Sequence, residues 1–215
     1  MAEVTITAGG VALQGDLNES GDARALVLFA HGSGSSRLSR RNRMVASAIR
    51  EAGIGTLLFD LLTPDEEAAD LRSGHLRFDI ASLAQRLREA TRWVREEAAR
   101  DIRIGYFGSS TGAAAALVAA AEEGERISAV VSRGGRPDLA GAALKQVRAP
   151  TLLIVGGLDG PVLSMNHEAF EQLECQKDIR TIEGATHLFS EPGALEQVPR
   201  YAAEWFRKHL AAPAR

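Results

Sequence analysis

Short apolar runs alternate along the chain with longer stretches in which apolar residues return at every third or fourth position. Each run is nearly continuous, which is typical of strands buried on both faces of a parallel sheet. The clearest runs span residues 25–30, 56–59, 102–107 and 151–155, and shorter candidates span 129–131 and 179–182. We predict that these runs are the strands of one mostly parallel sheet.

The intervening stretches predict amphipathic helices. They span about residues 41–53, 79–99, 111–124, 164–174 and 194–210. In the second stretch, Ile80, Leu83, Leu87 and Val94 fall on one face at helical spacing. Strands that alternate with helices imply right-handed crossovers. We therefore predict an α/β fold with a doubly wound sheet and helices on both faces.

The first residues follow a different pattern. Residues 3–7 and 11–17 alternate with period two, and Gly9-Gly10 separates them. This pattern predicts an antiparallel hairpin ahead of the main sheet. The chain has 215 residues, with no internal repeat and no linker-like tract, so we predict one domain over 1–215.

The strongest motif lies where such sheets bind ligands, at the carboxyl end of a strand. Gly108-Ser109-Ser110-Thr111-Gly112 follows the predicted strand 102–107 and precedes an alanine-rich helix. A serine at this junction takes a strained conformation that exposes its hydroxyl, and glycines beside it avoid collisions with neighbouring backbone. The glycine spacing selects Ser110 over Ser109 as a nucleophile. The alternative is an ordinary turn of small residues.

A serine nucleophile requires a base, and the base requires an orienting acid. Asp159 follows the strand 151–155, and His187 follows the strand 179–182 in a glycine-containing loop. The order Ser110, Asp159, His187 is typical of the α/β-hydrolase fold. Taken singly, Asp159 could cap a helix or shape a turn, and His187 could be an ordinary loop histidine. Three elements in the right order favour a catalytic triad.

Acyl transfer also needs backbone N–H groups that stabilise a developing oxyanion. Thr111, the residue after the nucleophile, supplies the first expected donor at a helix N-terminus. Ser33, in the loop 31–36, supplies the second through its backbone. The alternative for this loop is a flexible Gly/Ser segment, and it lacks the Gly-Lys-Ser/Thr end of a phosphate-binding loop. We expect His31 to be structural.

Together these residues resemble the dienelactone-hydrolase-like branch of the α/β-hydrolase superfamily. The resemblance covers essentially the whole chain and is closest to a bacterial subgroup with a serine nucleophile, found alone or fused to phosphoribosyltransferase-like domains. Its most specific stretches are His31–Arg37, Arg41–Arg43, Leu58–Thr63, Gly105–Gly108 and Ser132–Asp138.

The resemblance implies a compact fold, a serine or cysteine nucleophile, and hydrolysis of carboxylic esters. Dienelactone hydrolases proper use cysteine, whereas position 110 is serine, and this departure weakens dienelactone itself as the substrate. We predict a carboxylic-ester hydrolase that works through an acyl-enzyme on Ser110. The predicted reaction needs no metal and no organic cofactor.

Two features bear on the substrate. The segment 133–150 is too short to hold the cap that many lipases insert there, so we expect an open site for small or short-chain esters, lactones included. Arg37, Arg133 and Arg136 are candidate binding residues for an anionic substrate, because guanidinium groups suit carboxylates and phosphates. The favoured alternative is that they form salt bridges, for example with Asp60 or Asp138.

Two other functions stay open. The same triad could transfer the acyl group to an acceptor other than water, peroxide included. A non-catalytic α/β-hydrolase-fold protein could instead bind a ligand, or serve as an accessory to a phosphoribosyltransferase-like enzyme. The presence of all three triad residues disfavours this second alternative.

The composition argues against nucleic-acid and membrane partners and does not point to a particular partner. The formal net charge is −3 with no basic block, so we expect no nucleic-acid binding. No apolar run approaches the length of a membrane span, and the first residues do not resemble a signal peptide. Cys175 is the single cysteine, which excludes an intrachain disulfide. We expect a cytoplasmic monomer or homodimer that acts on a small-molecule ester.

Overall fold

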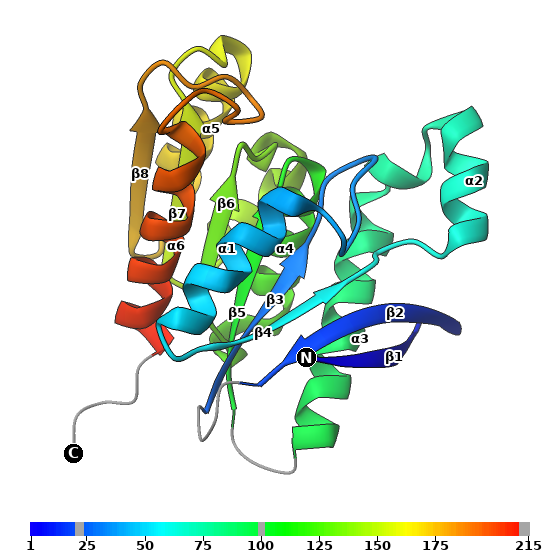
Figure 1. The fold of residues 1–215 in the computed structure, drawn as a ribbon. Coiled ribbons are helices and arrows are strands. Elements are labelled where there is room, and N and C mark those ends of the chain that lie inside the picture. The colour runs from blue at the N-terminus through cyan, green and yellow to red at the C-terminus, as the bar shows by residue number, and fades with distance from the viewer. Residues whose placement is uncertain (20–23, 99–101, 211–215) are drawn as a thin grey trace.

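A computed structural model describes residues 1–19, 24–98 and 102–210, and it shows one eight-stranded sheet with helices on both faces (Figure 1). The strand order is β1-β2-β4-β3-β5-β6-β7-β8. The strands are β1 (Ala2–Ala8), β2 (Val11–Asn18), β3 (Ala25–Ala30), β4 (Gly55–Phe59), β5 (Arg103–Ser109), β6 (Ile127–Arg133), β7 (Thr151–Gly156) and β8 (Lys177–Ile182). Every pairing from β4 to β8 is parallel, and β2 runs antiparallel to both neighbours. The predicted doubly wound, mostly parallel sheet is confirmed.

The N-terminal hairpin is also confirmed. β1 and β2 pair antiparallel from Ala2↔Leu17 to Ala8↔Val11. The turn needs both of its glycines, because Gly9 and Gly10 have φ values of 61° and 79°. Positive φ at both central residues suits the tight turns that match the twist of a hairpin.

All five predicted helices are present, and a sixth lies between β4 and α3. The helices are α1 (Arg40–Glu51), α2 (Pro64–Ser73), α3 (Ile80–Ala98), α4 (Thr111–Glu123), α5 (Gly160–Gln172) and α6 (Ala194–Leu210). The helices predicted from the sequence do not include this sixth one. In α2 the Thr63 hydroxyl accepts the Glu66 N–H, while the Glu66 carboxylate accepts the Thr63 N–H, which is a capping box.

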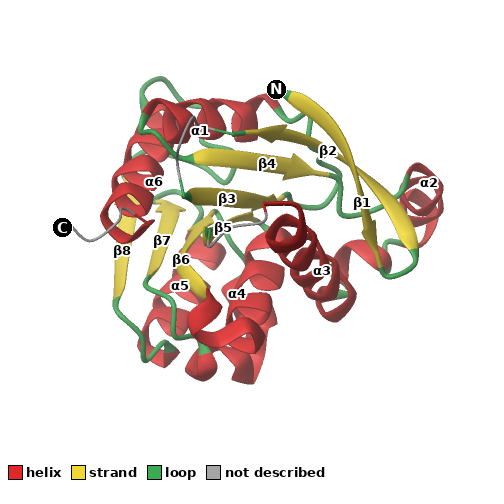
Figure 2. Ribbon diagram, turned by 90° about the horizontal axis from the view of Figure 1, so that it is seen from below, coloured by secondary structure: helices red, strands yellow, loops and turns green. Residues whose placement is uncertain are grey.

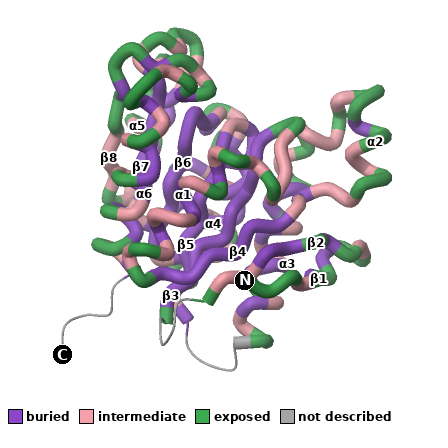
Figure 3. Tube along the Cα trace, in the orientation of Figure 1, coloured by how far each residue is buried: buried purple, intermediate pink, exposed green. Residues whose placement is uncertain are grey.

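The helices divide between the two faces of the sheet (Figure 2). α1 and α6 cover one face over a core that includes Val45, Ile49 and Phe206, and α3, α4 and α5 cover the other. The central strands are buried along most of their length, and exposure concentrates at the loops (Figure 3). The burial of these strands explains why they read as continuous apolar runs in the sequence.

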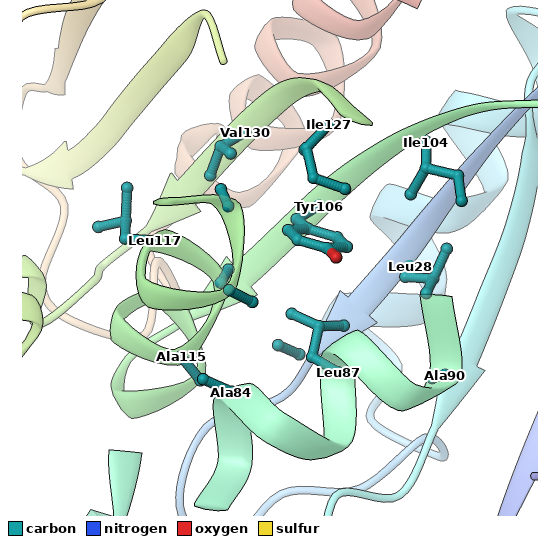
Figure 4. Packing of buried hydrophobic residues seen from close by; sticks show 14 of the residues in the cluster. Leu28, Ala84, Leu87, Ala90, Ile104, Tyr106, Ala115, Leu117, Ile127 and Val130 are labelled. Atoms are coloured by element: carbon teal, nitrogen blue, oxygen red, sulfur yellow. The ribbon is translucent and has the colours of Figure 1, made fainter. Parts of the chain in front are cut away.

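One polar group interrupts the larger core. Tyr106 is fully buried beside Leu28, Leu87 and Ile104 (Figure 4). Its hydroxyl lies 2.7 Å from Thr91 Oγ1, which donates to the Leu87 carbonyl oxygen at 2.9 Å. Tyr106 therefore donates to Thr91, and burial raises the pKa of its phenol above the usual range.

No cap domain is present in the described residues. Between β6 and β7 the chain forms only the 3₁₀ segment η3 (Pro137–Gln146). The larger excursion is between β4 and α3, where α2 projects from the body of the molecule and the short turn η1 (Leu76–Phe78) follows (Figure 1). None of the described helices combines the length and apolar character that a membrane crossing would need.

Candidate active site

Ser110 occupies the sharp turn between β5 and α4. Its φ is 50° and its ψ is −123°, a conformation that a residue with a side chain adopts at a cost of about 1–3 kcal/mol. Ser110 stands at the N-cap position of α4, yet its hydroxyl makes no capping hydrogen bond with the described residues. The strain and the unused hydroxyl both distinguish this turn from an ordinary strand–helix junction.

Glycines allow three backbone segments to meet around Ser110. A Cβ on Gly112 would overlap the carbonyl oxygens of Ala30 and His31, and one on Gly108 would overlap the start of α4. A Cβ on Gly32 would lie 2.9 Å from the Cβ of Ser110. The flanking glycines are therefore required by close packing, as the motif predicted.

The loop after β6 fixes the backbone of Ser110. The Ser110 N–H donates to the Arg133 carbonyl oxygen at 3.3 Å, and the Arg136 N–H donates to the Ser110 carbonyl oxygen at 3.1 Å. Both backbone groups of Ser110 are thereby used, so the neighbouring strand stabilises the strained turn.

Asp159 and His187 are in contact. His187 Nδ1 lies 2.7 Å from Asp159 Oδ2, although the residues are 28 positions apart. Asp159 stands at the N-cap position of α5, directly after β7, but its carboxylate makes no capping bond within the part of the chain that the structure describes. Its hydrogen-bond partner is the imidazole of His187. The helix-cap alternative therefore accounts for the position of Asp159 but not for the direction of its side chain.

The imidazole lies against the loop that supports Ser110. A Cβ placed on Gly134, directly after Arg133, would be 3.6 Å from His187 Cε1 and 3.2 Å from the His187 carbonyl oxygen. Because Asp159 accepts a hydrogen bond from Nδ1, the other ring nitrogen, Nε2, is left as a proton acceptor. The imidazole side chain is 38% exposed, so solvent and a small molecule can reach it.

The two expected oxyanion donors are also neighbours. The Ser33 N–H donates to Thr111 Oγ1 at 3.2 Å, and the two hydroxyl oxygens are 3.0 Å apart. The loop 31–36 thus reaches the N-terminus of α4. The Ser33 N–H is occupied by the Thr111 hydroxyl, so a substrate oxygen would have to replace that acceptor.

His31 has the structural role expected for it. It is buried, its Nδ1–H donates to the Gly32 carbonyl oxygen at 3.0 Å, and its Nε2 accepts the Leu61 N–H at 2.9 Å. Burial lowers the pKa of the imidazole, which stays neutral. His31 therefore joins the loop 31–36 to the segment after β4 and has no nitrogen left for catalysis.

A small cavity of about 170 Å³ lies beside Ser33 and Thr111. Sequence reasoning missed its outer wall, which α2 and the adjoining loop provide through residues such as Leu62 and Leu71. An ion pair of 2.5 Å between Arg77 and Asp70 lies in the same wall. The spacing of Thr63 and Glu66, which is typical of a capping box, is the signal in the sequence that could have identified this helix.

Two of the three candidate substrate-binding arginines are paired within the protein. Arg37 Nη1 lies 2.6 Å from Asp60 Oδ2, and Arg136 makes two hydrogen bonds of 2.8 and 2.9 Å to Asp138. These pairings favour the salt-bridge alternative for both residues. Arg133 differs, because it is buried and its guanidinium donates to the neutral amide oxygen of Asn42 at 3.3 Å.

The described ranges contain no group of three His, Cys, Asp or Glu side chains arranged to hold a metal ion. The residues gathered at this edge of the sheet are instead a hydroxyl, an imidazole, a carboxylate and backbone donors. Such a set is suited to nucleophilic chemistry at a carbonyl carbon.

The mostly parallel sheet with a strained serine between a strand and a helix defines the α/β-hydrolase fold. A model of the dienelactone hydrolase family matches residues 25–210, and the chain belongs to that family. The family and the fold together indicate a hydrolase.

A crystal structure of dienelactone hydrolase from Anabaena variabilis is 55% identical, with a TM-score of 0.95 over 98% of each chain. A cold-adapted esterase from an Arctic intertidal metagenomic library is 18% identical, with a TM-score of 0.78 over 97% of this chain and 93% of the other, and shows the shared fold.

A Mycobacterium tuberculosis protein named as a candidate phosphoribosyl transferase is 52% identical over 212 residues. That match covers 98% of this chain and 47% of the relative, so the chain spans about half the length of the curated relatives that it matches.

Proposed function

We propose that this chain hydrolyses small or short-chain carboxylic esters, lactones included, through an acyl-enzyme on Ser110. The observation that carries the proposal is the 2.7 Å contact between His187 Nδ1 and Asp159 Oδ2, made at the edge of the sheet where Ser110 stands strained and uncapped. The proposed roles are nucleophile for Ser110, base for His187 and orienting acid for Asp159.

The first step forms the acyl-enzyme. His187 Nε2 takes the Ser110 hydroxyl proton while Oγ attacks the carbonyl carbon, and the oxyanion accepts hydrogen bonds from the Ser33 and Thr111 backbone N–H groups. Collapse of this intermediate breaks the bond to the alcohol oxygen, which receives the proton from His187. Asp159 stabilises the imidazolium that exists between the two proton transfers.

The second step releases the acid. Water attacks the acyl carbon as His187 removes its proton, and Ser110 leaves with a proton returned by the same imidazole. Water balances the reaction, so the products are one alcohol and one carboxylic acid, or a hydroxy acid from a lactone.

The size of the cavity favours small substrates. Its 170 Å³ is below the range of about 300–1,000 Å³ that is usual for sites of drug-sized ligands. Its walls include Leu61, Leu62 and Leu83, which suit an apolar group of a few carbon atoms. The name of the M. tuberculosis relative does not guide this proposal, because the match covers about half of that protein.

The experiment compares p-nitrophenyl acetate and butyrate hydrolysis by wild type, Ser110→Ala and Ser109→Ala. Ser109 is the matched control, since it is the adjacent serine and lies buried at the end of β5. We expect Ser110→Ala to lose activity by at least about 10⁴-fold, because triad members act as a unit. Ser109→Ala should retain most of the activity. Equal activity in wild type and Ser110→Ala, with both proteins folded, would exclude the proposed nucleophile.

A further inference from the structure

Arg133 is a buried cation without a nearby carboxylate partner. Its relative exposure is 6%, and its guanidinium contacts the Asn42 amide oxygen at 3.3 Å and the Phe189 ring, whose centroid lies 5.7 Å from the guanidinium carbon. Neither contact carries a negative charge, and no salt bridge to Arg133 occurs among the described residues. Arginine is rarely buried unless it is paired, so this guanidinium is a candidate for an external anion.

Arg41 brings a second positive charge to the same place. Burial, followed by the charge of Arg41, lowers the pKa of Arg133 to about 10, which means that the two guanidinium groups repel each other. Arg41 Nε is itself buried and has no hydrogen-bond partner within residues 1–19, 24–98 and 102–210. The pair therefore offers hydrogen-bond donors and charge that the protein does not satisfy.

A groove connects Arg41 with the proposed oxyanion site. Its lining includes Ser33 at one point, Arg41 from α1 at another, and Leu188, the neighbour of His187. Arg133 does not line the groove itself, but its two contacts, Asn42 and Phe189, directly follow the lining residues Arg41 and Leu188 in the chain, which places it next to the groove wall. A group bound at the arginines would thus be part of a molecule that also reaches Ser33.

The charges around the groove do not balance. Asp16 and Asp60 are engaged by Arg37, just before α1, and by Arg43 in its first turn. Arg40 and Arg41 in the lining, and Arg133 beside it, then remain against Glu196, the carboxylate in that lining. The first turn of α1 contains no acidic residue either, so the helix dipole adds to the positive potential. After Glu196 is counted, about two positive charges remain, which is more than the single charge of a bound carboxylate ligand would neutralise.

We infer that the groove between the loop 31–36, α1 and the His187 loop binds the phosphate group of a phosphorylated ester substrate, with Arg133 and Arg41 as its ligands. A phosphate monoester carries close to two negative charges at neutral pH and offers several acceptor oxygens, whereas a carboxylate carries one charge. The inference rests on the proposed function for its account of the substrate, because it assigns a class of substrate to that same site.

Direct binding tests the inference without requiring catalysis. Phenyl phosphate and benzoate are titrated into wild-type protein by calorimetry at pH 7.5 and fixed ionic strength, since they share a ring and differ in charge. Arg41→Gln and Arg133→Met remove the proposed ligands. Arg50→Gln is the matched control, because Arg50 is on α1 as well but hydrogen-bonds to Thr56.

We expect phenyl phosphate to bind wild type at least tenfold more tightly than benzoate. Arg41→Gln and Arg133→Met should each weaken phenyl phosphate binding at least tenfold, and Arg50→Gln less than twofold. The inference would be overturned if phenyl phosphate did not bind at about 50 mM, a concentration that would detect even a millimolar Kd. Equal binding of phenyl phosphate by wild type and Arg41→Gln would also overturn it. Benzoate binding as tight as phenyl phosphate binding would overturn the assignment to a phosphate.

The outcome separates the inference from the proposed function. Ser110-dependent hydrolysis of p-nitrophenyl butyrate without phosphate binding would remove the inference and leave the proposed function in place. Arginine-dependent phosphate binding without Ser110-dependent hydrolysis would do the reverse.

Discussion

Arg133→Met should change stability little, despite removing a nearly fully buried side chain. Methionine has an unbranched apolar stem like that of arginine, but it is shorter and brings no charge. Burial and Arg41 lower the pKa of Arg133 from its ordinary value to about 10, which corresponds to about 3 kcal/mol against the charged form in the folded protein. Methionine relieves this penalty.

Two losses offset the gain. The hydrogen bond from Arg133 to Asn42 involves a charged donor and is worth about 1.5–3 kcal/mol. The cation–π contact with Phe189 contributes about 0.5–1 kcal/mol. The gain and the losses nearly cancel, so we expect the free energy of unfolding of Arg133→Met to lie within about 1 kcal/mol of wild type, or about 2–4 °C in Tm.

Arg37→Met provides the comparison. Arg37 is more exposed than Arg133, but its removal takes the guanidinium partner from Asp60 and leaves Asp16 paired with Arg43 alone. Breaking such a partly buried pair costs about 3 kcal/mol. Urea denaturation followed by circular dichroism would measure the free energy of unfolding of wild type, Arg133→Met and Arg37→Met. If Arg133→Met were destabilised as much as Arg37→Met, Arg133 would have a compensating charge in the folded protein, and the reasoning would be refuted.

Three further predictions concern the site and the core. Asp159→Asn should reduce kcat for p-nitrophenyl butyrate by about 10³–10⁴-fold with little change in stability, because a neutral amide neither fixes the imidazole tautomer nor stabilises the imidazolium. A loss under tenfold would argue against the assigned role. Tyr106→Phe should cost about 1 kcal/mol of unfolding free energy, whereas Thr91→Val should cost about 1–3 kcal/mol by leaving the phenol without an acceptor, and equal costs in urea denaturation would contradict the assigned donor direction. Because burial lowers the pKa of His31, the folded state binds fewer protons than the unfolded state just below pH 6.5, so stability should fall as the pH decreases from 6.5. Thermal melts of His31→Asn should show a weaker decrease over that pH range.

Local patterns explain which parts of the fold could be predicted. The buried strands have apolar runs of their own, and the start of α4 has a glycine motif, so both can be recognised without knowledge of distant residues. The start of α5 was predicted four residues late, at 164 and not at Gly160. Pro161 at the first turn was a usable signal, since proline fits the first helical positions.

The arginines show why the rest could not be predicted. Arg37 and Arg133 look equivalent in the sequence, because each follows a predicted strand near the site. Their difference depends on residues from other elements: Asp16 and Asp60 meet Arg37, whereas Arg133 meets Asn42 and Phe189. No local pattern encodes such partners. The cavity wall built by α2 depends in the same way on tertiary packing.

The hydrogen bond from the Ser33 N–H to Thr111 Oγ1 has a consequence for how binding energy is used. In the resting protein this donor already has a neutral acceptor, so a neutral ester carbonyl that replaces the hydroxyl gains little. An oxyanion in the same place gains a charge-assisted bond, which is roughly twice as strong. The exchange therefore discriminates between the ground state and the tetrahedral intermediate, and it favours turnover over tight retention of the substrate.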